Sequence, residues 1–279
     1  MSRDCSKQVA DVLQQIRDLG VIIETKEDIG YPGPVSAVLS RMVGDPLIDF
    51  TDTLNVDCTM LFAYISDLSH GQVEPKDWHH QFLCKQMKSE SQEQLLPSTV
   101  WPTCGARRMV CTREAINRAL AILNSLGTET EKLRMDYLLG VDKSLSREQL
   151  IAGFQKHSEY DVPKDWMLPV EVVDLDIDRI RAELPPVVKE VSEVLMGINE
   201  SVFLFGWWKG ITTISSNSVV AKDIENVIEA NRAEDDDVKG PHVWLSPMPR
   251  SLVGKEKEKR MAKIPETDEV VTKVEGEDE

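Results

Sequence analysis

Several features that would identify common protein classes are missing from this chain of 279 residues. No apolar run approaches the roughly 20 residues that a membrane-spanning helix needs, which excludes an integral membrane protein. The first residues have no apolar core of a secretory signal, so we expect an intracellular protein, cytoplasmic or nuclear. The P-loop, GxGxxG, GxSxG and HExxH motifs are also absent, so the enzyme classes that carry them have no support.

Cysteine and positive charge are both scarce. The five cysteines contain no CxxC pair and are odd in number, which is typical of a reducing compartment. His80 and Cys84 stand one helical turn apart, but the cysteine spacing fits no finger or ribbon, so no zinc is expected. The net charge of −16 disfavours tight non-specific binding to nucleic acid, although a local basic groove or a metal-bridged contact stays compatible with it.

Short β-rich segments alternate with amphipathic helical segments along most of the chain, which favours an α/β fold with a mostly parallel sheet covered by helices. We expect an N-terminal helical segment at 1–44, an α/β domain at 45–252 and an acidic, disordered tail at 253–279. The strands are predicted at 21–23, 54–57, 107–112, 202–205, 210–215 and 242–245. The helices are predicted at 9–19, 35–43, 58–69, 77–95, 113–126, 147–157, 176–199 and 219–228.

Sites in such sheets form beyond the carboxyl ends of the strands, where loops enter helices. Asp57 stands at such a turn, directly after an apolar strand and before an apolar helix. Burial of a carboxylate is costly unless it is paired, hydrogen-bonded or bound to metal. Two interpretations fit Asp57: a metal ligand, or an N-cap of the following helix.

Two further acids and a pair of tryptophans also have both a functional and a structural interpretation. Glu114 begins a predicted helix, either as a second carboxylate of the site or as a favourable charge at the helix dipole. Glu200 follows an apolar helix, either as a further ligand or as a solvated acid. Trp207, Trp208 and Lys209 together predict a surface that stacks RNA bases, contacts a protein partner or covers an edge of the core.

Residues 54–71 read LNVDCTMLFAYISDLSHG, in which a strand delivers Asp57 and Thr59 and a helix follows with Tyr64 and an L-S-x-G ending. This arrangement resembles the opening of the PIN-like domain in the eukaryotic "domain of unknown function 1308" family. The resemblance continues in patches over roughly 45–252, at 111–127, 202–224 and 242–252. It implies a three-layer α/β/α fold around a parallel sheet, in a chain shorter at its amino end than the family members.

Active PIN domains are metal-dependent ribonucleases in which three or four carboxylates hold Mg²⁺ or Mn²⁺ at the strand ends. The resemblance implies Asp57 as the first acid and Thr59 as a supporting residue. Arg118 occupies the place of the second acid, which leaves Glu114 one turn earlier. Ser216 and Asn217 replace a later acid, with Glu200 the nearby alternative.

The implied metal ligands are therefore Asp57, Glu114, Glu200 and Asn217, with Asp57 and Glu114 catalytic and Thr59 and Ser216 supporting. Two hypotheses follow from this incomplete acidic set. The first is a Mg²⁺- or Mn²⁺-dependent ribonuclease or RNA-processing factor that acts weakly on single-stranded RNA. The second is an inactive PIN-like scaffold that binds a protein partner. Neither involves a membrane.

Overall fold

The computed structural model of the protein describes residues 3–24, 47–71, 73–232 and 238–254. The chain divides into two units, Met1–Asp49 and Phe50–Glu279. The first contains helix α1 (Arg3–Asp18), and residues 21–24 after it have no regular structure, so the strand predicted at 21–23 is wrong. The helix predicted at 35–43 and most of the predicted acidic tail lie outside the described residues.

Five parallel strands form one sheet in the second unit, in the order β3-β2-β1-β4-β5. The strands are β1 (Thr53–Val56), β2 (Arg108–Thr112), β3 (Glu171–Val173), β4 (Thr212–Ser215) and β5 (Val243–Leu245). The chain winds from β1 outward to β3, then returns to place β4 on the other side of β1. The direction of winding therefore switches between β1 and β4, where α/β sheets form a crevice beyond the strand ends.

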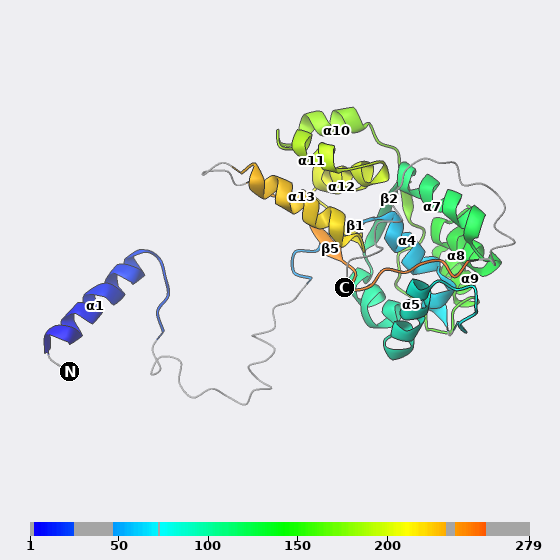
Figure 1. Ribbon diagram of the computed structural model, residues 1–279, viewed down its shortest axis with the longest axis horizontal. Coiled ribbons are helices and arrows are strands. Elements are labelled where there is room, and N and C mark those ends of the chain that lie inside the picture. The colour runs from blue at the N-terminus through cyan, green and yellow to red at the C-terminus, as the bar shows by residue number, and fades with distance from the viewer. Residues whose placement is uncertain (1–2, 25–46, 72, 233–237, 255–279) are drawn as a thin grey trace. The chain divides into compact units, whose positions relative to one another are not determined.

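Helices cover both faces of this sheet and complete a three-layer α/β/α fold, as predicted (Figure 1). Helix α4 packs with α7 and α8, whereas α12 lies against β1, β2 and β4, with α10 beside it. The helices are α4 (Cys58–Ile65), α5 (Gln81–Gln92), α6 (Trp101–Cys104), α7 (Arg113–Leu126), α8 (Glu129–Leu139), α9 (Arg147–Gln155), α10 (Ile177–Glu183), α11 (Val188–Val194), α12 (Ile198–Lys209) and α13 (Ser218–Ala230), with a 3-10 helix η1 (Asp67–His70) and a π-helical turn η2 (Leu96–Val100). No helix among the described residues is long and apolar enough to cross a membrane.

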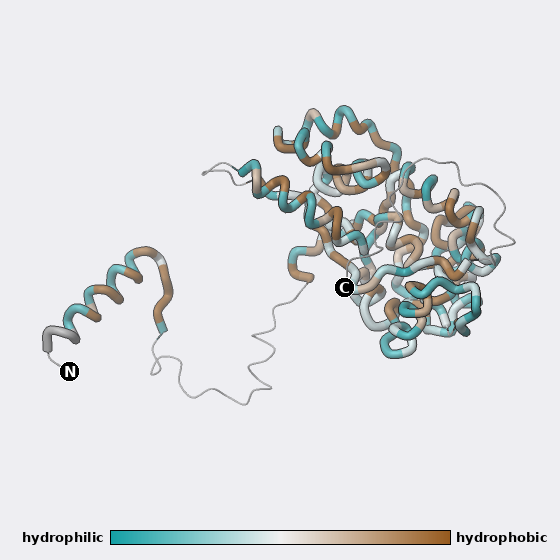
Figure 2. Tube along the Cα trace, in the orientation of Figure 1, coloured by the Kyte–Doolittle hydropathy of each residue, from teal (hydrophilic) through white to brown (hydrophobic). Residues whose placement is uncertain are grey.

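Local patterns explain where the prediction of elements succeeded and failed. In Figure 2, hydrophobic and hydrophilic residues alternate along α13, the pattern that predicted this helix. The strand predicted at 202–205 is wrong, because these residues lie in α12, where they are buried on every side. An apolar helix buried all round has no period to distinguish it from a strand. The prediction also missed α8 and β3.

Close approach of α12 to the sheet depends on a glycine. Asn55 on β1 donates hydrogen bonds from Nδ2 to the Val202 carbonyl on α12 (2.8 Å) and to Thr213 Oγ1 on β4 (3.0 Å). Gly206 faces this pair, and a Cβ added to it would lie 2.0 Å from Thr213 Oγ1 and 3.2 Å from Asn55 Nδ2. The contact between α12 and the two central strands therefore requires the missing side chain.

The segment 246–254 after β5 connects α5 to the end of α4 and to α8. The Val253 amide donates to Glu131 Oε1 on α8 (2.8 Å), and the Ser251 carbonyl accepts from the Ser66 hydroxyl (2.7 Å). Arg250 forms a fully buried ion pair with Glu90 of α5. This C-terminal strap, residues 246–254, thus fixes α5 against the rest of the domain.

We predict that Gly206→Ala destabilises the domain. Alanine normally favours a helix interior by about 1 kcal/mol over glycine, but the clash with Thr213 should reverse the sign and cost roughly 1–3 kcal/mol. Urea unfolding measures the difference. Glu225→Ala at an exposed position of α13 is the control and should change stability by less than about 0.5 kcal/mol. A Gly206→Ala protein as stable as the wild type would contradict the close approach.

His70 predicts a pH dependence of stability. Its Nε2 donates to the Tyr64 carbonyl (2.6 Å), and burial, with Arg134 nearby, lowers the pKa of His70 to about 3. The imidazole of the unfolded chain takes up a proton below about pH 6.5, whereas the imidazole of the folded chain stays neutral. The contribution of His70 to the free energy of unfolding is therefore lost as the pH falls from about 6.5 toward 3, by roughly 1.4 kcal/mol per pH unit.

The measurement is urea unfolding between pH 7 and pH 4 for the wild type and His70→Gln, which keeps a side-chain N–H donor. Asp57 and Glu131, whose pKa values burial raises, act in the opposite direction in both proteins and cancel in the comparison. We expect a shallower loss of stability in the variant. Equal slopes, or a His70 imidazole that titrates near 6 by NMR, would refute the assignment.

Candidate functional site

Three helices begin at the carboxyl edge of the sheet, and each starts directly after a strand. Helix α4 follows Asp57, α7 is capped by Thr112, whose Oγ1 accepts from the Ala115 amide (3.3 Å), and α13 is capped by Asn217 Oδ1, which accepts from the Val220 amide (3.3 Å). The carboxyl ends of β1 and β4 therefore lie among helix N-termini. Their positive dipole ends favour negative charge there.

Asp57 is the centre of a polar cluster that joins the ends of β1 and β4. Its Oδ2 accepts from Thr59 Oγ1 and from Ser215 Oγ, both at 2.6 Å. The Ser216 amide donates to Thr59 Oγ1 (3.0 Å), and the Asn217 amide donates to Ser215 Oγ (2.9 Å). We call these five residues the switch-point cluster.

The hydrogen bonds of this cluster run from two backbone amides through two hydroxyls to Asp57. Each hydroxyl accepts from its amide and donates its single proton to the Asp57 carboxylate. The charged form of Asp57 therefore has two neutral donors on Oδ2. Both hydroxyl bonds reach the same oxygen, and neither reaches Oδ1.

Burial is the dominant influence on the Asp57 carboxyl. The residue is 1% exposed, and loss of solvent raises its pKa above the ordinary value, although the hydroxyls of Ser215 and Thr59 lower it in part. The amides of Cys58 and Thr59 also favour the charged form, but the side chain makes no capping hydrogen bond to α4. Asp57 occupies the N-cap position, yet its oxygen is held by hydroxyls rather than by helix amides.

The two neighbouring thiols are inert. Burial, followed by the Asp57 charge, raises the pKa of Cys58, and Arg118 opposes this shift. The pKa of Cys111 lies well above 9, first because it is buried, with Cys58, Asp57 and Glu114 adding to the shift. Both are protonated free thiols at neutral pH, which excludes them as thiolate nucleophiles or ligands in this state.

Other predicted site residues make different contacts. Glu114 is exposed in the first turn of α7, near enough to act on Cys111 at the same edge. Glu200 Oε1 accepts from Arg181 at 2.6 and 2.8 Å, so its charge is already paired. Asn217 uses Oδ1 to cap α13. The hydroxyl of Ser216 is buried without a hydrogen-bond partner among the described residues.

The predicted metal set fits this geometry only in part. Within the described ranges, no group of three or more His, Cys, Asp or Glu side chains is placed to hold a metal ion. Glu200 and Asn217 are engaged elsewhere, so Asp57 and Glu114 are the two implied ligands that stay available. The three implied carboxylates, Asp57, Glu114 and Glu200, therefore do not form one metal-binding group among the described residues.

The tryptophan pair lies half-buried against the core. Trp207 Nε1 donates to the Lys239 carbonyl (2.8 Å), and Trp208 Nε1 donates to Glu183 Oε2 (2.7 Å). The Lys209 ammonium lies 3.7 Å from the centre of the Trp208 ring, a cation–π contact. Both indoles thus have hydrogen-bond partners within the chain. This agrees with the interpretation in which the pair covers an edge of the core.

Ser215 is the site residue that sequence reasoning missed. It was placed in a predicted strand, and its role depends on parallel pairing of β4 with β1, which brings it beside Asp57. The available signal was the alternation of Thr213 and Ser215, which puts both side chains on the face that Asn55 and Asp57 share.

We predict that Thr59→Val and Ser215→Ala each destabilise the fold by about 1–2 kcal/mol at pH 7.5. Each change removes a donor to Asp57, raises its folded pKa further and leaves one backbone amide unpaired. The charge-dependent part of the loss should shrink as the pH falls through the folded pKa, because a protonated Asp57 needs fewer donors. Unfolding at two pH values, with exposed Ser98→Ala as the control, tests this. A loss that does not depend on pH would argue against a charged Asp57.

A family model matches part of the chain. The family model described as "Protein of unknown function (DUF1308)" matches residues 54–156. No curated protein and no solved structure matches the chain. The matched stretch runs from β1 to just beyond α9 and includes Asp57, Thr59 and Glu114, whereas Ser215–Asn217 lie outside it. Over this stretch the chain is similar to a family whose function is not known.

Proposed function

We propose that the chain is a PIN-like domain that acts on single-stranded RNA at the switch-point cluster, with slow turnover. Asp57 is the principal carboxylate, and Glu114 is its partner in holding one Mg²⁺ or Mn²⁺ ion. Such an ion activates water and stabilises the charged phosphoryl transition state when bound. The parallel three-layer fold and the match over residues 54–156 are the background to this proposal.

The observation that carries the proposal is the buried Asp57 carboxylate at the point where the winding of the sheet reverses. Its raised pKa means that burial disfavours the charged form, so a charged Asp57 costs free energy. A carboxylate perturbed by burial in a crevice of this kind is typical of a functional site. The orphan hydroxyl of Ser216 supports the same interpretation, since a bound ligand or its water would give it a partner.

Each residue has a separate role in this arrangement. Thr59 and Ser215 fix the orientation of Asp57, so Oδ1 is the oxygen available to a ligand. Asp57 in its charged form attracts the cation, and Glu114 adds a second negative charge from α7. Slow turnover follows from the incomplete set, because two carboxylates compensate a divalent charge less well than three or four.

A specific observation also favours the second candidate, an inactive scaffold. The carboxylate of Glu200 is paired with Arg181, and half-buried Arg118 lies near Cys58, where its charge opposes a cation. A domain with this arrangement retains the fold without metal-dependent cleavage. Cation binding separates the two candidates before any RNA is added.

We predict that Mn²⁺ binds the wild type in calorimetry and raises its thermal midpoint, and that Asp57→Asn weakens binding at least about tenfold. Asparagine keeps an oxygen acceptor for the two hydroxyls, so the variant should stay folded. Mn²⁺-dependent cleavage of a single-stranded RNA should fall to background in the same variant.

Asp165→Asn is the matched control, because Asp165 is an exposed carboxylate away from the cluster, and it should bind Mn²⁺ like the wild type. Equal Mn²⁺ binding by wild type and Asp57→Asn would sink the proposed site. Binding of Mn²⁺ without cleavage would remove the ribonuclease activity and leave a cation-binding scaffold.

A further inference from the structure

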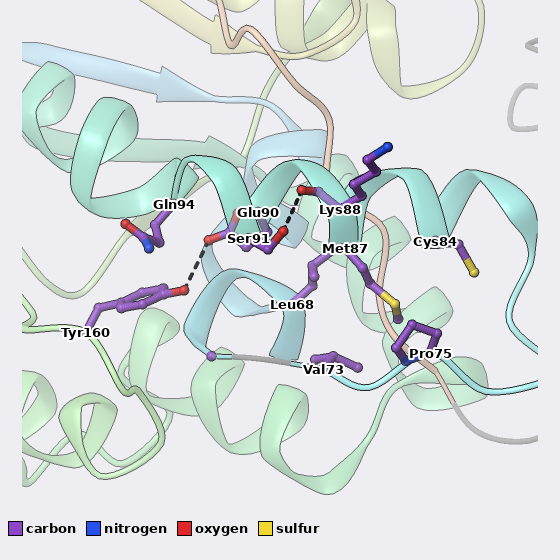
Figure 3. Close-up of a pocket in the computed structure, with 11 residues that line it drawn as sticks. Leu68, Val73, Pro75, Cys84, Met87, Lys88, Glu90, Ser91, Gln94 and Tyr160 are labelled. Atoms are coloured by element: carbon purple, nitrogen blue, oxygen red, sulfur yellow. Dashed lines mark hydrogen bonds between the residues drawn. The ribbon is translucent and has the colours of Figure 1, made fainter.

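A second candidate site lies at the other end of α4 from Asp57. Here a cavity of about 320 Å³ opens between α5 on one side and η1 with the following loop on the other. Its volume is at the lower end of the range for small-molecule sites. Figure 3 shows the side chains that line it, with Tyr160 at one end and Cys84 at the other.

One wall of this pocket is apolar. Leu68 and Met87 are buried and pack with Leu83 and with Val253 of the C-terminal strap, while Val73 packs against them from the loop. In Figure 3, Val73, Leu68 and Met87 lie side by side below α5. A hydrocarbon group of a ligand would lose water against this wall.

The other end of the pocket holds a carboxylate with spare hydrogen-bonding capacity. Glu90 is 3% exposed, and its Oε2 accepts from Arg250 and from the Leu95 amide (3.2 Å). Its Oε1 receives only a long bond from the Tyr160 hydroxyl (3.5 Å), drawn as a dashed line in Figure 3. A carboxylate oxygen normally accepts shorter and more numerous bonds, so Oε1 can take an N–H donor from a ligand.

The local charge at this end favours a cation. Glu159 packs against Gly71, where an added Cβ would lie 2.7 Å from its carboxyl carbon. Burial, followed by the charges of Glu90 and Glu159, raises the pKa of Tyr160 to about 12. Arg250 neutralises Glu90, and Glu159 is exposed, so the excess negative charge beside the Tyr160 hydroxyl is small and partly screened by solvent.

The lysine on the rim does not cancel this charge. In Figure 3 the side chain of Lys88 extends away from Tyr160 and Leu68, on the far side of α5. Its ammonium is therefore directed to solvent, where its field is strongly screened. The polar end of the pocket stays an acceptor site with a negative balance.

We propose that this pocket binds a small organic cation, a primary amine that carries an apolar group. The ammonium donates to Glu90 Oε1 and lies beside the Tyr160 hydroxyl, and the apolar group lies against Leu68, Val73 and Met87. This site is independent of the switch-point cluster, because it uses none of the same residues. The probe that tests it is the n-hexylammonium ion, with n-hexanol and hexanoate as neutral and anionic analogues.

We expect hexylammonium to shift the methyl NMR signals of Met87 and Val73 with a saturable Kd on the order of 1 mM. Hexanol should bind about tenfold more weakly, and hexanoate should give no saturable shift. Tyr160→Phe should weaken the ammonium about threefold, since it removes one polar partner. Glu90→Gln is unsuitable alone, because it leaves the buried Arg250 without its charge partner.

Two tryptophan variants make a matched pair. Ser91 and Gln92 are neighbouring exposed residues of α5, but only Ser91 lines the pocket. Ser91→Trp should fill the cavity and abolish the shifts, whereas Gln92→Trp should bind like the wild type. Asp57→Asn should also bind like the wild type, which separates this test from that of the proposed function. Equal binding of hexanol and hexylammonium, or binding unchanged by Ser91→Trp, would overturn the proposal.

Discussion

The hydroxyl bonds from Thr59 and Ser215 to Asp57 are the constraint on which the site depends. They connect the turn after β1 with the turn after β4, two segments more than 150 residues apart in the chain. Each hydroxyl also accepts from a backbone amide, so the carboxylate is held by neutral donors that are themselves fixed in place. The bond from Ser215 lies at the carboxyl ends of β1 and β4, where the winding of the sheet reverses. Fold and candidate site therefore share one set of interactions.

Close packing of α12 against β1 and β4 supports the site from farther back along the strands. Asn55 and Thr213 stand two residues before Asp57 and Ser215 on the same strands, and they bind each other where Gly206 lets α12 approach. Close packing there holds β1 and β4 in register, and the register places the two turns opposite each other. The relative positions of Asp57 and Ser215 thus depend on packing farther back along the two strands.

Sequence reasoning predicted the fold class correctly, and it placed Asp57 between a strand and a helix, because both depend on local patterns. An apolar strand followed by an acid and a helix is visible in one window. The contacts that decide the chemistry are not local. Nothing near Glu200 in the sequence indicates that Arg181 would pair with it, and nothing near Asp57 indicates Ser215. The apolar helix at 202–205 was mistaken for a strand, because full burial removes the period that separates the two.

The two buried carboxylates at opposite ends of α4 differ in how their charge is compensated. Glu90 has a full counter-charge, since Arg250 is buried against it with no exposed side-chain surface. Asp57 has only hydroxyl and amide dipoles, and no ion pair with it occurs among the described residues. Burial of a charge without a counter-charge is the costlier arrangement. A fold that needed Asp57 only to join two turns would be served by asparagine, which accepts the same two bonds without that cost. A cation bound at Asp57, as in the proposed function, would supply the counter-charge that the described residues do not.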